Sequence, residues 1–195
     1  MSSQPKPYFT EEQYLEIEES SEQRSEYFRG EMFPMEAGTF RHATIHSNVV
    51  LTLGRELQGS GCRVWLGDLR VKASQTGLYT YPDIVVICGT PQMSDTDKGK
   101  DTVVNPTVIV EILSPTTENY DRGNKFVHYR SIPSFCEYLL IAQDRMQAEH
   151  HAKQPDGGWL FHEVSGPEGI ISLDSIGVRF NLSEAYDGVE LRQPT

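Results

Sequence analysis

Hydrophobic residues recur at every fourth position between residues 42 and 57, which predicts an amphipathic helix over this stretch. The repeated residues are Ile45, Val49, Leu53 and Leu57. A Gly-Ser-Gly segment at 59–61 marks the predicted end of the helix. A helix is also predicted to start at Thr10, a hydroxyl residue followed by two acids. A third is predicted over 121–131.

Short apolar runs between these helices predict the strands. They form four strands, which are 62–74 with a break at Gly67-Asp68, 81–88, 107–113 and 137–142, and a hairpin is predicted over 26–36 with its turn at Arg29-Gly30. In 69–74 apolar residues alternate with polar ones, so we expect one solvated face carrying Arg70 and Lys72. The resulting order is helix, three strands, helix, strand.

The chain of 195 residues is interpreted as one domain, 1–195, with a core at about 42–142. Turn signals and short alternating stretches after Asp144 predict a C-terminal β-meander extension over about 144–192. The polar segment from Gly89 to Asn105 is long, and it is therefore expected to be a mobile loop.

Composition and charge narrow the classes of function. There are 17 Lys and Arg against 28 Asp and Glu, a formal net charge of −11, which disfavours indiscriminate binding of nucleic acid but leaves a local basic patch open. The apolar runs are too short to span a bilayer, and the first residues do not resemble a secretory signal.

The number and spacing of the cysteines also bear on the cellular compartment of the protein. Cys62, Cys88 and Cys136 are widely spaced and form no CxxC pair, so no disulfide framework and no zinc site is expected. Cys88 and Cys136 lie in apolar runs and are interpreted as buried thiols. A cytoplasmic location fits this pattern.

Two acids interrupt strands that are otherwise apolar. Asp83 lies in YPDIVVIC and Glu111 in TVIVEILSP. A strand that is apolar on both faces is buried on both faces, and a carboxylate there must be neutralised, paired or bound to a metal. Each acid alone is as well explained by an ion pair or by backbone N–H groups. Together, on neighbouring strands, they suit one divalent ion.

Lys125 is the cation best placed to join them. Glu111 lies two residues before the end of its strand, which is about 7 Å along the strand. Lys125 lies four residues after Asp121, where the next helix is predicted to start, which is about 6 Å along the helix. A helix folding back over the sheet would bring Lys125 level with Glu111. A surface i,i+4 pair between Asp121 and Lys125 explains the spacing at least as well.

The run YPDIVVICG and the longer run NPTVIVEILSPTTENYDRGNKFVHYRSIPSFCEYLLI resemble the Uma2 family, catalogued as the domain of unknown function DUF820. The resemblance covers nearly the whole chain, including Gly30-Glu31 and His42 upstream. Through this family the chain is similar to the restriction-endonuclease-like PD-(D/E)XK nucleases. That similarity implies an α/β (α+β) fold with an αβββαβ core, a mixed central sheet, an N-terminal helix and hairpin, and the C-terminal β-meander.

The resemblance also implies site residues. Asp83 matches the acid of the PD motif, and Glu111 matches the first acid of (D/E)XK. The superfamily lysine would stand at Leu113, which is a departure, and Lys125 on the following helix is the matching candidate. Mg²⁺ or Mn²⁺ would be bound by Asp83, Glu111 and the backbone carbonyl of Ile112.

Three further residues are candidates for supporting roles. Glu31 is either another acid of the site or a solvated strand acid. His42 either contacts a phosphate or caps its helix, and Arg122 either binds phosphate or pairs with Asp121.

The implied activity is a magnesium-dependent endonuclease that hydrolyses DNA through a local groove, and the superfamily implies a homodimer. The alternative is a catalytically inactive module that binds nucleic acid or protein on the same fold. A third possibility is hydrolysis of another phosphate ester, such as a nucleotide or RNA.

Overall fold

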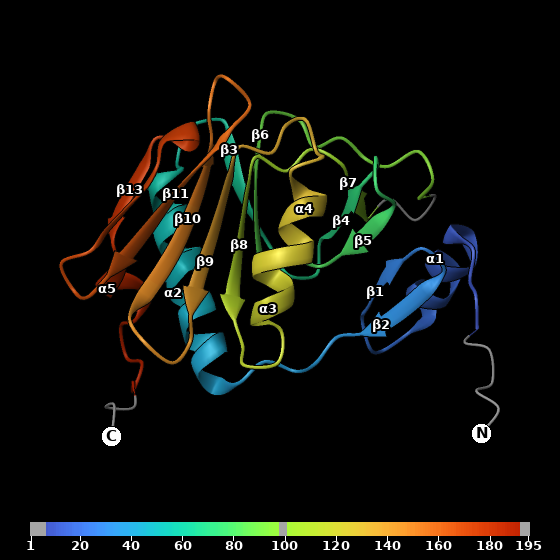
Figure 1. Ribbon diagram of the computed structural model, residues 1–195, viewed down its shortest axis with the longest axis horizontal. Helices are drawn as coiled ribbons and strands as arrows, with labels where there is room; N and C mark the ends of the chain where they lie inside the picture. Colours follow the sequence, from blue (N-terminus) through green and yellow to red (C-terminus); the bar gives the residue numbers. More distant parts are fainter. Residues whose placement is uncertain (1–6, 98–100, 192–195) are drawn as a thin grey trace.

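A six-stranded mixed sheet forms the centre of the molecule, as the computed structural model shows for residues 7–97 and 101–191 (Figure 1). The strand order is β11-β10-β9-β8-β6-β3, and β8 and β9 are its parallel pair. The strands are β3 (Cys62–Leu66), β6 (Ile84–Cys88), β8 (Val108–Leu113), β9 (Glu137–Ala142), β10 (Gln147–Lys153) and β11 (Trp159–Ser165).

One face of this sheet is covered by the long helix α2 (Phe40–Glu56) and by C-terminal elements. These elements are the hairpin β12 (Ile170–Leu173) and β13 (Val178–Asn181), the 3₁₀ turn Asp174–Ile176 and the short helix α5 (Leu182–Ala185). The side chains of α2 predicted to face inward, among them Ile45 and Val49, are fully buried in this layer. The C-terminal segment therefore both extends the sheet, through β10 and β11, and packs beside α2.

The opposite face carries a composite helix and a second sheet. The helix runs through α3 (Glu118–Tyr120), a π-helical turn (Asp121–Lys125) and α4 (Phe126–Tyr129). Figure 1 shows it lying over β8. The second sheet has the order β2-β1-β5-β4-β7. Its strands are β1 (Ser25–Phe28), β2 (Glu31–Pro34), β4 (Arg70–Ala73), β5 (Leu78–Thr80) and β7 (Thr102–Val103).

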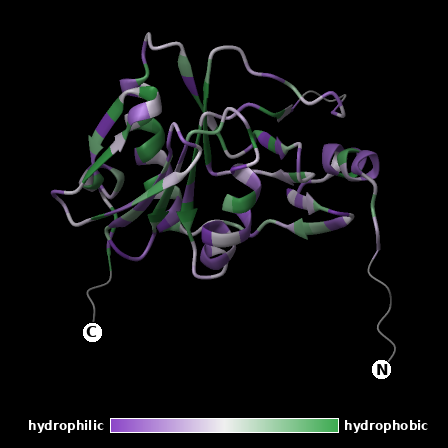
Figure 2. Ribbon diagram, turned by 45° about the horizontal axis from the view of Figure 1, so that its top comes forward, coloured by the Kyte–Doolittle hydropathy of each residue, from purple (hydrophilic) through white to green (hydrophobic). Residues whose placement is uncertain are grey.

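The N-terminal helix α1 (Glu11–Ser20) packs against this second sheet. Thr10 caps it, as predicted, and Tyr14 and Leu15 are buried, whereas Ile17 is exposed. Figure 2 shows that hydrophobic residues concentrate in the central strands, whereas α1 is largely hydrophilic. Within the described residues, no helix combines the length and apolar character needed to cross a membrane.

Most predicted elements are present, but the predicted solvated face of 69–74 is wrong. All four residues of β4 are buried. Arg70 donates to Asp97 at 2.8 Å, and Lys72 donates to Glu11 at 2.8 Å. The polar positions of this strand are therefore occupied by buried cations that pair with acids, and not by side chains in contact with water.

The expected mobile loop at 89–105 is also more structured than predicted. It contains β7, and Asp97 is buried against Arg70. Residues 98–100 of this segment lie outside the described residues. The predicted strand 81–88 is shorter than expected, because β6 begins at Ile84, and β5 precedes it as a separate strand.

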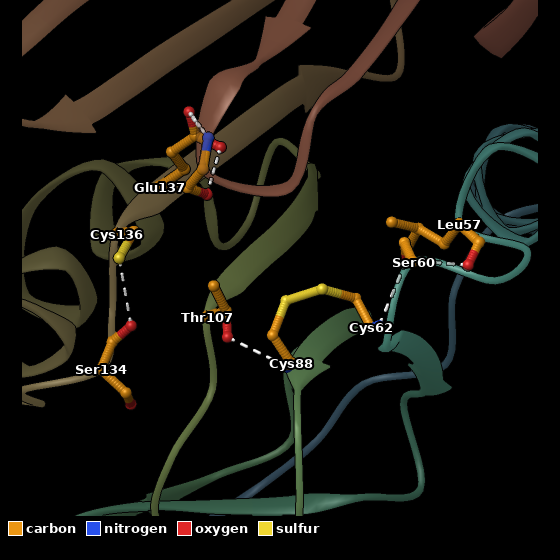
Figure 3. The surroundings of a disulfide bond; sticks show 9 residues. Leu57, Ser60, Cys62, Cys88, Thr107, Ser134, Cys136 and Glu137 are labelled. Atoms are coloured by element: carbon orange, nitrogen blue, oxygen red, sulfur yellow. Dashed lines mark hydrogen bonds between the residues drawn. A yellow bond between two sulfur atoms is a disulfide. The ribbon is translucent and has the colours of Figure 1, made fainter.

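The cysteine prediction is wrong for two of the three residues. Cys62 and Cys88 are register partners on β3 and β6 and form a disulfide (Figure 3). Only the third, Cys136, is a free thiol, and it is half-buried. Because disulfides are rare in reducing compartments, the cysteines no longer support a cytoplasmic location.

Candidate active site

The two predicted acids lie side by side on neighbouring strands. Asp83 immediately precedes β6, and Glu111 lies within β8, where Ile84 and Val110 are register partners. The Asp83 amide donates to a carboxylate oxygen of Glu111 at 3.3 Å. Side chains alternate along a strand, so Glu111 shares the face of Ile109 that the composite helix covers.

Asp83 is held by donors from two directions. Its Oδ2 accepts from the Ile112 amide at 2.7 Å and lies 3.1 Å from Nε2 of His42, in the first turn of α2. Burial alone would raise the pKa of Asp83, but the contacts with His42 outweigh it, and the pKa is lowered. His46, one turn later, contacts the backbone carbonyl of Asp83 at 3.0 Å. The two histidines of α2 therefore both contact Asp83.

Glu111 is buried and bound by two donors. Lys125 Nζ lies 3.1 Å from Oε1 of Glu111, and the Tyr129 hydroxyl donates to the same oxygen at 3.0 Å. Burial raises the pKa of Glu111 to about 8, with added repulsion from Asp83 and Asp121, while Lys125 opposes the rise. Burial therefore makes the carboxyl group of Glu111 harder to ionise than that of an exposed glutamate.

Lys125 is surrounded by carboxylates. Its Nζ lies 3.1 Å from Glu111, 3.1 Å from Glu26 and 3.2 Å from Asp121. Burial opposes the charge on Lys125, but Glu111 and Glu26 hold its pKa well above the usual value. The i,i+4 pair with Asp121 exists, but both residues are buried, so the interpretation as a surface pair is wrong.

A π-helical turn positions the lysine. The segment Asp121–Lys125 interrupts the composite helix with a wider turn, an irregularity that is frequent at functional sites. The position of the superfamily lysine, Leu113, is buried in the apolar core. The amino group beside Glu111 therefore comes from the helix.

The three supporting candidates have different outcomes. His42 reaches the site through Asp83. Arg122 pairs with Glu118 and, at 2.8 Å, with Glu149, so the alternative in which it pairs with Asp121 is wrong. Glu31 is the first residue of β2 and is the register partner of Phe28 on β1. The hairpin acid that contacts Lys125 is Glu26, which the sequence did not single out.

The donor set fits a hard divalent ion. Four carboxylates, from Glu26, Asp83, Glu111 and Asp121, face one lysine and one histidine. Such an excess of anionic oxygen suits Mg²⁺ or Mn²⁺. Among the described residues, no group of three or more His, Cys, Asp or Glu side chains is arranged to hold a metal by itself. A metal here would use two side chains together with backbone and solvent oxygen.

The fold defines the class of protein. The mixed α+β architecture is the restriction-endonuclease-like fold, and the chain superposes on a crystal structure from Anabaena variabilis described as "a putative nuclease belonging to DUF820". The TM-score is 0.74 at 17% identity, over 91% of this chain and 97% of the other. At this identity the similarity shows the fold alone.

Sequence comparison then identifies the family. The chain belongs to the Uma2 family, described as "Putative restriction endonuclease", whose model matches residues 11–183. Two uncharacterized Synechocystis proteins are similar. The protein slr1290 is 32% identical over 96% of both chains, and sll1609 is 34% identical over 84% of this chain and 92% of its own length. Family membership supports a nuclease-like function.

Proposed function

We propose that this protein is a metal-dependent endonuclease that hydrolyses DNA phosphodiester bonds. The observation that carries the proposal is the convergence of Asp83, which is half-buried, with the buried Glu111 and Lys125 between β6, β8 and the composite helix. Asp83, Glu111 and the backbone carbonyl of Ile112 would hold Mg²⁺ or Mn²⁺. When bound, the ion would supply an activated water and neutralise the phosphate.

The residues of the chain have separate roles in this proposal. Water attacks phosphorus, the P–O bond to the leaving sugar oxygen breaks, and a proton passes to that oxygen. Lys125 orients the attacking water and stabilises the negative charge that develops on the phosphoryl oxygens. His42 keeps Asp83 ionised and oriented, because it contacts the carboxylate at 3.1 Å.

The net charge of −11 requires DNA to approach locally rather than through the general field of the protein. Cutting both strands would require two sites, so the proposal includes a homodimer, which light scattering of the purified protein would test.

A second candidate function is a binding module without catalysis. It is favoured by the contacts of Glu111, whose Oε1 already accepts from Lys125 and Tyr129. A module of this kind has no need to bind magnesium at the two acids.

The deciding experiment combines calorimetry with a cleavage assay. Mg²⁺ and Mn²⁺ are titrated into the wild type, Glu111→Gln and the control Glu149→Gln, whose acid pairs with Arg122 instead. We expect binding in the wild type and control and loss in Glu111→Gln. A plasmid assay with Asp83→Asn follows. Cleavage that persists in Asp83→Asn would refute the proposed site, and metal binding without cleavage of any substrate would favour the module.

A further inference from the structure

Glu26 connects the second sheet to the proposed catalytic lysine. It lies on β1, in the N-terminal hairpin, and is 7% exposed. One of its oxygens is 3.1 Å from Lys125 Nζ, and the same oxygen accepts a hydrogen bond from the Thr80 hydroxyl on β5. A buried carboxylate fixed in this way has little freedom to move away from the lysine.

The geometry around Lys125 gives Glu26 a distinct task. An ammonium group has three N–H donors, and three carboxylates lie within 3.2 Å of this one. Asp121 is on the same helical turn and moves with the lysine. Glu111 is the acid whose charge a metal would share. Glu26 comes from a different sheet, so it can define where the ammonium lies relative to β8.

We infer that Glu26 is a positioning residue, which holds the Lys125 ammonium in place beside Glu111 when that carboxylate turns to a metal ion. The inference rests on the proposed function. It assigns the N-terminal hairpin a direct part in the site, although the catalytic acids come from the central sheet. A misplacement of about 1 Å in such a group can reduce the rate about 100-fold.

The test is a set of variants in the magnesium-dependent plasmid assay. Glu26→Gln should lower kcat about 100-fold with KM unchanged, because the buried Glu26 acts through Lys125 and not through substrate binding in this proposal. Glu26→Asp should recover part of the loss, since it restores the charge on a shorter side chain. The matched control is Glu18→Gln, which removes another buried acid of the same region, one that accepts from the Ser25 amide at 2.9 Å. The control should keep the wild-type kcat.

A double-mutant cycle with Lys125→Met separates positioning from a general structural effect. If Glu26 acts through the lysine, Glu26→Gln adds no loss of kcat in the Lys125→Met background, and in urea unfolding without metal it lowers the midpoint less in that background than in the wild type. Additive losses, or a wild-type kcat in Glu26→Gln, would overturn the inference while leaving the nuclease proposal intact. A wild-type protein without metal-dependent cleavage would instead overturn the proposed function, and the role of Glu26 with it.

Discussion

The Cys62–Cys88 disulfide makes a quantitative prediction about stability. The two residues are 26 apart in sequence, so the bond closes a loop of this size in the unfolded chain. The loop-entropy relation gives a stabilisation of about 3.5 kcal/mol for such a loop. For a chain of this length, each kcal/mol shifts Tm by about 2–4 °C, so reduction should lower Tm by about 7–14 °C.

Thermal unfolding with and without dithiothreitol measures this effect. The wild type should lose stability on reduction, and Cys62→Ala/Cys88→Ala should melt at the lower temperature and not respond to dithiothreitol. Cys136→Ala is the matched control and should respond like the wild type, because Cys136 is a free thiol. Equal Tm values for the oxidised and reduced wild type would refute the reasoning, as would three free thiols by mass spectrometry of the non-reduced protein.

Three further predictions concern buried charge. Lys125→Met should destabilise the metal-free protein by about 3–5 kcal/mol in urea unfolding, because it leaves the clustered carboxylates without their cation; an unchanged midpoint would contradict this. Asp97→Asn should cost a similar amount by the same assay, because Arg70 is then buried without its anionic partner, whereas the exposed Asp144→Asn should cost nothing measurable. Since the pKa of Glu111 is raised to about 8, metal binding must displace its proton, and calorimetric affinity for Mg²⁺ should rise about tenfold per pH unit below that value; affinity independent of pH would show that Glu111 is not the ligand.

The two acids of the proposed site could be predicted because each interrupts a long apolar run. Asp83 and Glu111 carry their signal locally, and the family resemblance favoured Lys125 as a site residue over the surface pair with Asp121 that its spacing also allowed. The resemblance identified the helix that carries the lysine, but the π-helical turn was not predicted, since no local residue pattern specifies it. Four strands of the central sheet, β3, β6, β8 and β9, were also predicted, because they are short apolar runs, whereas β10 and β11 were predicted only as part of a C-terminal meander.

The predictions that were wrong or missing share one physical cause, because each depends on contacts between residues that are distant in sequence. Arg70 and Lys72 alternate with apolar residues in the manner of a solvated strand, but their partners lie 27 and 61 residues away. Glu26 belongs to a hairpin whose burial depends on packing against the rest of the fold. The disulfide requires the register of β3 on β6, which the spacing of the cysteines does not encode.

The π-helical turn at Asp121–Lys125 limits how this helix can tolerate insertions and deletions. Such a turn holds one residue more than the α-helical turn it replaces, and each residue of an α-helix rotates the side chains by about 100°. Deleting one residue from 121–125 would give a regular helix with better backbone hydrogen bonds. It would then direct either the lysine or the buried pair Phe126 and Tyr129 toward β8, but not both. A regular helix in this chain therefore cannot keep Lys125 beside Glu111 and also keep Phe126 and Tyr129 packed in the core.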